Sequence, residues 1–127
     1  MKHSILVVED DQLSRELLCD WLDSEGYEVL SAKDLNSGLA AVQNRHPQVV
    51  LLDVQLGADD GLSLAAWIRQ QPALCRTPVI AVTAHAMVRE QERILKAGCN
   101  SFISKPVDFR LLRESLQRWL PAPEAKR

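Results

Sequence analysis

Three apolar stretches of four residues are rich in the β-branched residues Val and Ile: Ile5 to Val8, Val49 to Leu52 and Val79 to Val82. Strands with one face in water alternate apolar and polar residues, whereas strands of a parallel sheet are covered on both faces and are continuously apolar. Segments with apolar residues at helical spacing separate the three stretches. The pattern therefore predicts an α/β protein whose strands are parallel and flanked by helices.

Two less apolar stretches, Tyr27 to Ala32 and Ser101 to Ser104, extend the alternation to five strands. Asp34 and Asp108 are predicted helix caps, and Gly26 is predicted to end the first helix. Right-handed crossovers put helices on both faces of such a sheet. We predict a doubly wound, flavodoxin-like (βα)5 fold with strand order 2-1-3-4-5, whose ligand crevice lies between the first and third strands.

Composition argues for one ordinary globular domain. The chain has 127 residues and a formal net charge of -2, which leaves no basic surface for nucleic acid. No apolar run approaches the ~20 residues of a membrane span. Cys19, Cys75 and Cys99 form no metal-ligand pattern, so we expect free thiols and a cytoplasmic location. Residues 1–120 are predicted to form the domain, and residues 121–127 a C-terminal tail or truncated linker.

Polar side chains follow four of the predicted strands at the point where each strand ends. Glu9 and Asp10 follow the first strand, Asp53 follows the third, Thr83 the fourth and Lys105 the fifth. Because the carboxyl ends of parallel strands share one edge, we expect these groups to meet there. Carboxylates suit Mg²⁺, and a carboxylate can also be the nucleophile that forms an acyl phosphate. The hydroxyl and the ammonium could contact phosphoryl oxygens, so the sequence predicts a magnesium and phosphoryl site.

Each of these residues has a plainer explanation when it is taken alone. Asp53 could be a turn residue, Thr83 a helix N-cap and Lys105 a solvated lysine. Asp11 is predicted to cap the first helix rather than to bind metal. The prediction of a site depends on the combination, in which four strand ends carry suitable groups in chain order.

The chain resembles the receiver domain of two-component response regulators over about residues 4 to 120. The stretches that carry the resemblance are Ile5 to Asp11, Val50 to Asp53, Asp60-Gly61, Val82 to Ala84 and Ser104 to Pro106. The resemblance implies phosphoryl transfer to Asp53 from a phosphohistidine on a sensor histidine kinase or a histidine phosphotransfer protein, as in a phosphorelay. Such a domain is not an enzyme beyond catalysing its own phosphorylation and dephosphorylation.

The same resemblance implies roles for individual residues. The implied Mg²⁺ ligands are Glu9, Asp10, Asp53 and the backbone carbonyl of Gln55. Thr83 and Lys105 match the phosphoryl contacts, and the peptide bond before Pro106 is typically cis in such domains. Thr83 and Phe102 match a switch pair, in which the aromatic ring moves inward when the hydroxyl moves toward the phosphoryl group.

One stretch departs from the family's pattern, and two further positions are implied to affect how long the phosphoryl group persists. Leu56-Gly57 stands where the family commonly has Met-Pro, so the turn-rich loop from Gly57 to Asp60 is expected to be mobile or differently shaped. Gln55 and His85 lie two positions beyond Asp53 and Thr83, where the resemblance implies control over how fast water removes the phosphoryl group.

Two partner surfaces are implied by family analogy. The first helix near Leu13, Ser14 and Leu17 is the expected contact for a histidine-bearing helix bundle. The readout face is expected on the helix near residues 86–96, the fifth strand and the last helix, with candidates Val88, Arg89, Glu92, Leu95, Arg113 and Trp119. A downstream effector or an attached domain is expected, without direct contact to nucleic acid or membrane, and the oligomeric state stays open.

Two other functions remain as alternatives. A Mg²⁺-dependent phosphohydrolase with an aspartyl nucleophile would need a carboxylate two residues after Asp53, where Gln55 cannot serve as general acid. A receiver-fold binding domain that is never phosphorylated would not need the acid pair, Thr83 or Lys105. A flavodoxin is disfavoured because no Ser/Thr/Gly-rich phosphate loop follows the first strand.

Overall fold

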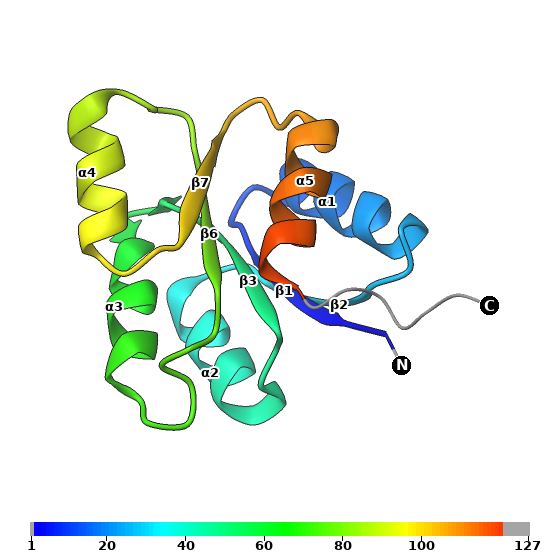
Figure 1. The fold of residues 1–127 in the computed structure, drawn as a ribbon, viewed down its shortest axis with the longest axis horizontal. Coiled ribbons are helices and arrows are strands. Elements are labelled where there is room, and N and C mark those ends of the chain that lie inside the picture. Colours follow the sequence, from blue (N-terminus) through cyan, green and yellow to red (C-terminus); the bar gives the residue numbers. More distant parts are fainter. Residues whose placement is uncertain (1, 121–127) are drawn as a thin grey trace.

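The computed structural model describes residues 2–120, which form a single five-stranded parallel sheet with helices on both faces (Figure 1). The strands of this sheet are β1 (Ser4–Val8), β2 (Glu28–Ala32), β3 (Val49–Asp53), β6 (Val79–Thr83) and β7 (Ser101–Ser104). Their order is β2-β1-β3-β6-β7 and every pairing is parallel. The predicted fold class and strand order are therefore confirmed. The predicted tail at 121–127 lies outside the described residues.

Five helices connect the strands: α1 (Gln12–Ser24), α2 (Leu35–Arg45), α3 (Leu62–Gln70), α4 (Val88–Lys96) and α5 (Phe109–Trp119). Figure 1 shows α1 and α5 together on one face, with α2 and α3 on the other. Within residues 2–120, no helix is both long and apolar enough to cross a membrane.

Alternate residues of each strand supply two separate cores. In β1, Ile5 and Val7 pack with the α1–α5 side of the sheet, while Leu6 and Val8 pack with the α2–α3–α4 side. All four of these side chains are buried. Burial on both faces explains why the strands are continuously apolar.

The predicted caps begin their helices as expected. The Asp11 carboxylate accepts the Ser14 backbone N–H at the start of α1. Asp34 and Ser37 form a reciprocal capping box on α2, and Asp108 accepts backbone N–H groups at the start of α5. These caps satisfy backbone donors that the first turn of a helix leaves unpaired.

A short antiparallel hairpin, β4 (Gln55–Leu56) with β5 (Asp59–Asp60), replaces the turn-rich loop predicted after β3. Its tip contains Gly57, whose φ of 59° lies in the left-handed region that glycine adopts without steric cost. The buried Leu56 side chain holds the first strand of the hairpin on the core. The expectation that this loop is mobile or differently shaped from the family's pattern stays a prediction.

Candidate metal and phosphoryl site

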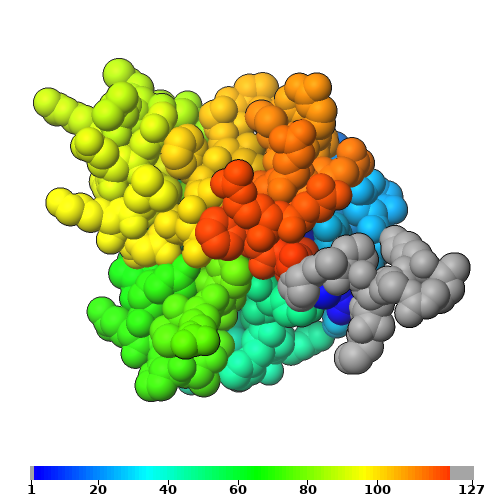
Figure 2. All heavy atoms as spheres, viewed as in Figure 1, coloured from blue at the N-terminus to red at the C-terminus, as the bar shows by residue number. Residues whose placement is uncertain are grey.

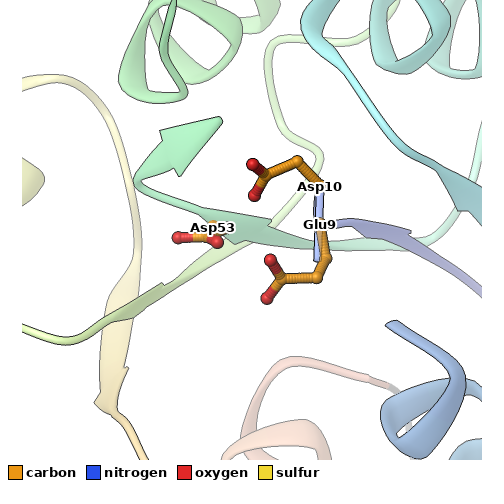
Figure 3. Close-up of side chains that lie close together, drawn as sticks. All are labelled: Glu9, Asp10 and Asp53. Atoms are coloured by element: carbon orange, nitrogen blue, oxygen red, sulfur yellow. The ribbon is translucent and has the colours of Figure 1, made fainter. Parts of the chain in front are cut away.

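Three carboxylates meet at the carboxyl edge of the sheet, between β1 and β3. Glu9 and Asp10 directly follow β1, and Asp53 is the last residue of β3. One oxygen from each lies within 4.8 Å of the others. Figure 3 shows the three side chains directed toward a common space. Glu9 and Asp53 are 2% and 7% exposed, whereas Asp10 is exposed. The expected convergence of these acids is present.

Lys105 lies between two of the carboxylates. Its Nζ donates to Glu9 Oε1 at 3.0 Å and to Asp53 Oδ2 at 3.0 Å. Burial on its own lowers the pKa of Lys105, but the hydrogen bonds and ion pairs with Asp53 and Glu9 outweigh burial and raise it. The side chain is therefore a permanent ammonium, and the peptide bond that follows it, to Pro106, is cis as predicted.

Glu9 is the carboxyl most disturbed by its surroundings. Burial, followed by its interaction with Asp53, raises the pKa of Glu9 from 4.5 to about 7, although Lys105 acts in the opposite direction. The Lys105 ammonium therefore does not offset the combined effect of burial and Asp53 on Glu9. A divalent cation bound to these oxygens would favour the charged form of Glu9 and relieve the repulsion.

Thr83 ends β6 on the same edge, and its hydroxyl is bonded to its own loop. Thr83 Oγ1 accepts the His85 N–H at 3.0 Å and donates to the His85 carbonyl at 3.1 Å. The hydroxyl still lines a cleft of about 530 Å³ together with Asp10, Asp53 and Lys105. Thr83 therefore closes a local turn and is not the N-cap of α4, which is Met87. The alternative that Thr83 is only a helix N-cap is wrong.

Gln55 lines this cleft, whereas Phe102 lies outside it. The Gln55 backbone N–H donates to Asp53 Oδ1 at 3.1 Å, and its side chain is exposed. Phe102, on β7, is half-buried against the α2–α3–α4 core and also lines a groove of about 350 Å³ beside α5. The ring therefore borders both the interior and the surface.

The sequence argument missed two groups that hold the strand ends in place. Arg15 donates from Nη1 to the Glu9 carbonyl at 2.9 Å, which ties α1 to the end of β1. Gly61 packs so closely on the Asp53 carbonyl that an added Cβ would overlap that oxygen. The Asp60-Gly61 motif was the visible signal for Gly61, whereas Arg15 looked like any helical arginine.

One candidate for the readout face was wrong. The Arg113 guanidinium binds both Glu25 carboxylate oxygens, at 3.0 and 3.1 Å, and lies over the Trp21 ring. Arg113 therefore faces α1, on the other side of α5 from β7. Trp119 is also half-buried against the α1–α5 core.

The remaining candidates lie on α4. Val88 and Leu95 are 69% and 51% exposed, and Arg89 and Glu92 are exposed as well. Figure 2 shows side chains of α4, coloured yellow-green to yellow, standing clear of the body of the molecule. This helix presents apolar and charged groups together to solvent.

The doubly wound sheet and its acidic edge are those of a signalling domain of two-component systems. The chain belongs to the response regulator receiver domain family, whose model matches residues 5–117.

Individual relatives agree with this assignment. The polar-differentiation response regulator DivK of Brucella ovis is 35% identical over 120 residues, covering 94% of this chain and 98% of DivK. The structure of Vibrio cholerae chemotaxis protein CheY4 is 26% identical with a TM-score of 0.89, covering 94% of this chain and all of that one (100%). NtrX from Brucella abortus is 34% identical with a TM-score of 0.84, covering 94% of this chain but 27% of the NtrX chain.

Proposed function

We propose that Asp53 is the phosphoacceptor of this receiver domain and takes its phosphoryl group from a phosphohistidine. A carboxylate oxygen of Asp53 would bond to phosphorus as the P–N bond breaks, leaving the imidazole neutral after it takes up a proton. The observation that carries the proposal is the contact set of Asp53. Its Oδ2 accepts from Lys105 and its Oδ1 from the Gln55 N–H, so the carboxylate is held at the floor of the open cleft.

Receiver domains generally bind Mg²⁺ at an acidic pocket, and the residues here suit that ion. Glu9, Asp10, Asp53 and the Gln55 carbonyl are the proposed ligands, all of them hard oxygen donors. Burial first and Asp53 second raise the pKa of Glu9, and a bound cation would favour its charged form. Bound Mg²⁺ would supply charge neutralisation for the incoming phosphoryl group.

Lys105 and Thr83 are the proposed contacts for the transferred group. The Lys105 ammonium already lies 3.0 Å from Asp53 Oδ2, so it can follow the negative charge onto a phosphoryl oxygen. Thr83 would exchange its hydrogen bonds with His85 for one to the phosphoryl group. That movement would free volume for Phe102, which makes these two residues the proposed switch.

The proposed phosphodonor is a sensor histidine kinase or a histidine phosphotransfer protein, docking on α1. Leu13 and Leu17 are 75% and 58% exposed there. A groove of about 420 Å³ between Leu17 and Pro106 leads to Glu9 and Lys105. An effector, free or covalently attached, would read α4. The free thiols of this chain support a cytoplasmic location.

Labelling with a small phosphodonor such as acetyl phosphate tests the proposal. We expect the wild-type chain to incorporate one phosphoryl group only when Mg²⁺ is present, and Asp53→Asn to incorporate none. Asp59→Asn is the matched control, because Asp59 is an exposed carboxylate that lines the same cleft. Labelling of Asp53→Asn to the wild-type extent would reject Asp53, and repeated turnover of a phosphate ester would favour a phosphohydrolase instead.

A further inference from the structure

Asp10 is held differently from the other two acids of the cluster. Glu9 and Asp53 both bind Lys105, whereas the Asp10 carboxylate has no ion pair among residues 2–120. Its Oδ2 accepts one hydrogen bond, from the Gly57 backbone N–H at 2.9 Å. A residue 47 positions away in the sequence therefore orients this exposed carboxylate.

Gly57 can make this contact because of the shape of the hairpin tip. Its φ of 59° turns the N–H back toward β1. The hairpin is anchored on both strands: the Gln55 N–H binds Asp53 Oδ1, and Asp60 Oδ2 accepts Arg93 Nη1 of α4 at 2.7 Å. Two anchors restrict how far the tip can move away from Asp10.

A hydrogen bond to one carboxylate oxygen changes how the carboxylate can bind a metal. The Gly57 N–H already uses one of the two lone pairs of Oδ2, so Oδ1 is the oxygen with more open acceptor sites for a bond to a cation. Mg²⁺ requires a nearly ideal octahedron at short distances, whereas Ca²⁺ is larger, tolerates irregular geometry and often takes both oxygens of one carboxylate. The Gly57 contact therefore favours the smaller ion.

We propose that Gly57 is a positioning residue that sets the preference of this site for Mg²⁺ over Ca²⁺ by fixing Asp10 for one-oxygen coordination. The inference rests on the proposed function in one respect, that Asp10 is a metal ligand. It adds a role for a backbone N–H at a position where the family commonly has proline, which has no such donor.

The test compares Gly57→Ala with Gly26→Ala in the unphosphorylated protein. A Cβ at Gly57 would meet only Asp10 Oδ2, at 3.8 Å, so space is sufficient and only the positive φ resists the change. Gly26 also has a positive φ, of 94°, and open space around it, but it lies at the end of α1. Both variants strain a left-handed residue, and only one of them adjoins the metal site.

Dissociation constants for Mg²⁺ and Ca²⁺ are measured by isothermal titration calorimetry, without any phosphodonor. Alanine keeps the backbone N–H, but its preference for negative φ turns that N–H away from Asp10. We therefore expect Gly57→Ala to bind Mg²⁺ about tenfold more weakly, as loss of an outer hydrogen bond to a ligand does. Its Ca²⁺ affinity should change much less, so the preference for Mg²⁺ over Ca²⁺, measured as the ratio of the Ca²⁺ to the Mg²⁺ dissociation constant, should fall. Gly26→Ala should keep the wild-type ratio.

The outcomes separate this inference from the proposed function. A wild-type chain that binds no Mg²⁺ would overturn both. If the wild-type chain binds Mg²⁺ but Gly57→Ala keeps the wild-type ratio of the Mg²⁺ and Ca²⁺ dissociation constants, the role of Gly57 is overturned and the proposed function is not. Should that variant not fold, amide hydrogen exchange of wild-type Gly57 decides: protection that persists when Mg²⁺ is added supports the contact, and loss of protection overturns it.

Discussion

The two ends of the sheet each hold a partly buried cation, and the two cations are satisfied in different ways. At the carboxyl end, Lys105 is shared between the carboxylates of Glu9 and Asp53. At the amino end, Arg69 of α3 donates to the Gly98 carbonyl at 2.9 Å, to the Thr77 carbonyl at 2.7 Å and to Asn100 Oδ1 at 2.7 Å.

The difference lies in the charge of the partners. Arg69 binds neutral oxygens, which satisfy its donors without repelling one another, and it ties α3 to the residues just before β6 and β7. Lys105 faces acids that do repel one another: Asp53 is one cause of the raised pKa of Glu9, and a third carboxylate, Asp10, lies nearby. A cluster with surplus negative charge attracts a cation, whereas the amino-end cluster is complete in itself. We therefore expect the amino end of the sheet to be structural and the carboxyl end to bind a cation.

Breaking the amino-end cluster should have the largest effect on stability. Arg69→Met would leave the Gly98 and Thr77 carbonyls without this donor, although Asn100 Oδ1 would keep the Val79 N–H. We expect the free energy of unfolding to fall by about 3 kcal/mol. Mg²⁺ affinity should be unchanged, since the variant acts at the far edge of the sheet. Urea denaturation and calorimetry measure the two quantities. Arg76→Met, at an exposed position, is the control for the lost charge. Weaker Mg²⁺ binding in Arg69→Met would contradict the expectation that the two ends of the sheet act independently.

The carboxyl end should respond to pH and the amino end should not. Burial and Asp53 raise the pKa of Glu9 from 4.5 to about 7. In the pH window between these two values, the folded state therefore binds more protons than the unfolded state. Stability should therefore fall as pH rises through the window, by at most about 3 kcal/mol.

Saturating Mg²⁺ should remove this dependence, because the metal replaces the proton. Denaturation curves at both ends of the window, with and without Mg²⁺, measure the effect. Glu9→Gln supplies the control, since it cannot titrate. A stability that rises through the window in the metal-free protein would show that Glu9 is not the group that titrates.

The smallest effect is expected for the anchor between the hairpin and α4. Arg93 and Asp60 form an exposed ion pair, so Arg93→Ala should cost no more than about 1 kcal/mol of stability. Mg²⁺ affinity should fall slightly, by about twofold, because Gly57 loses one restraint. Arg89→Ala on the same helix is the control for charge. If Arg93→Ala weakened Mg²⁺ binding as much as is expected for Gly57→Ala, we would assign the positioning of Asp10 to α4 and not to the turn.

Much of the site was predictable because its residues adjoin strong strand patterns. Asp53 and Thr83 end fully buried strands, so their place at the carboxyl edge follows from the fold class alone. Arg113 was misplaced because helical spacing gives the faces of α5 but not which neighbour each face meets. The β4–β5 hairpin was missed because strands of two residues carry no periodic signal.

The sequence by itself determined the parallel sheet, its strand order and the group of residues at its carboxyl edge, since burial on two faces leaves a pattern in every strand. Only the tertiary structure decided which groups touch there: that Lys105 pairs with Glu9 and Asp53, and that Gly57 binds Asp10. The physical reason is that hydrogen bonds depend on distance and direction between residues far apart in the chain, and local patterns carry neither.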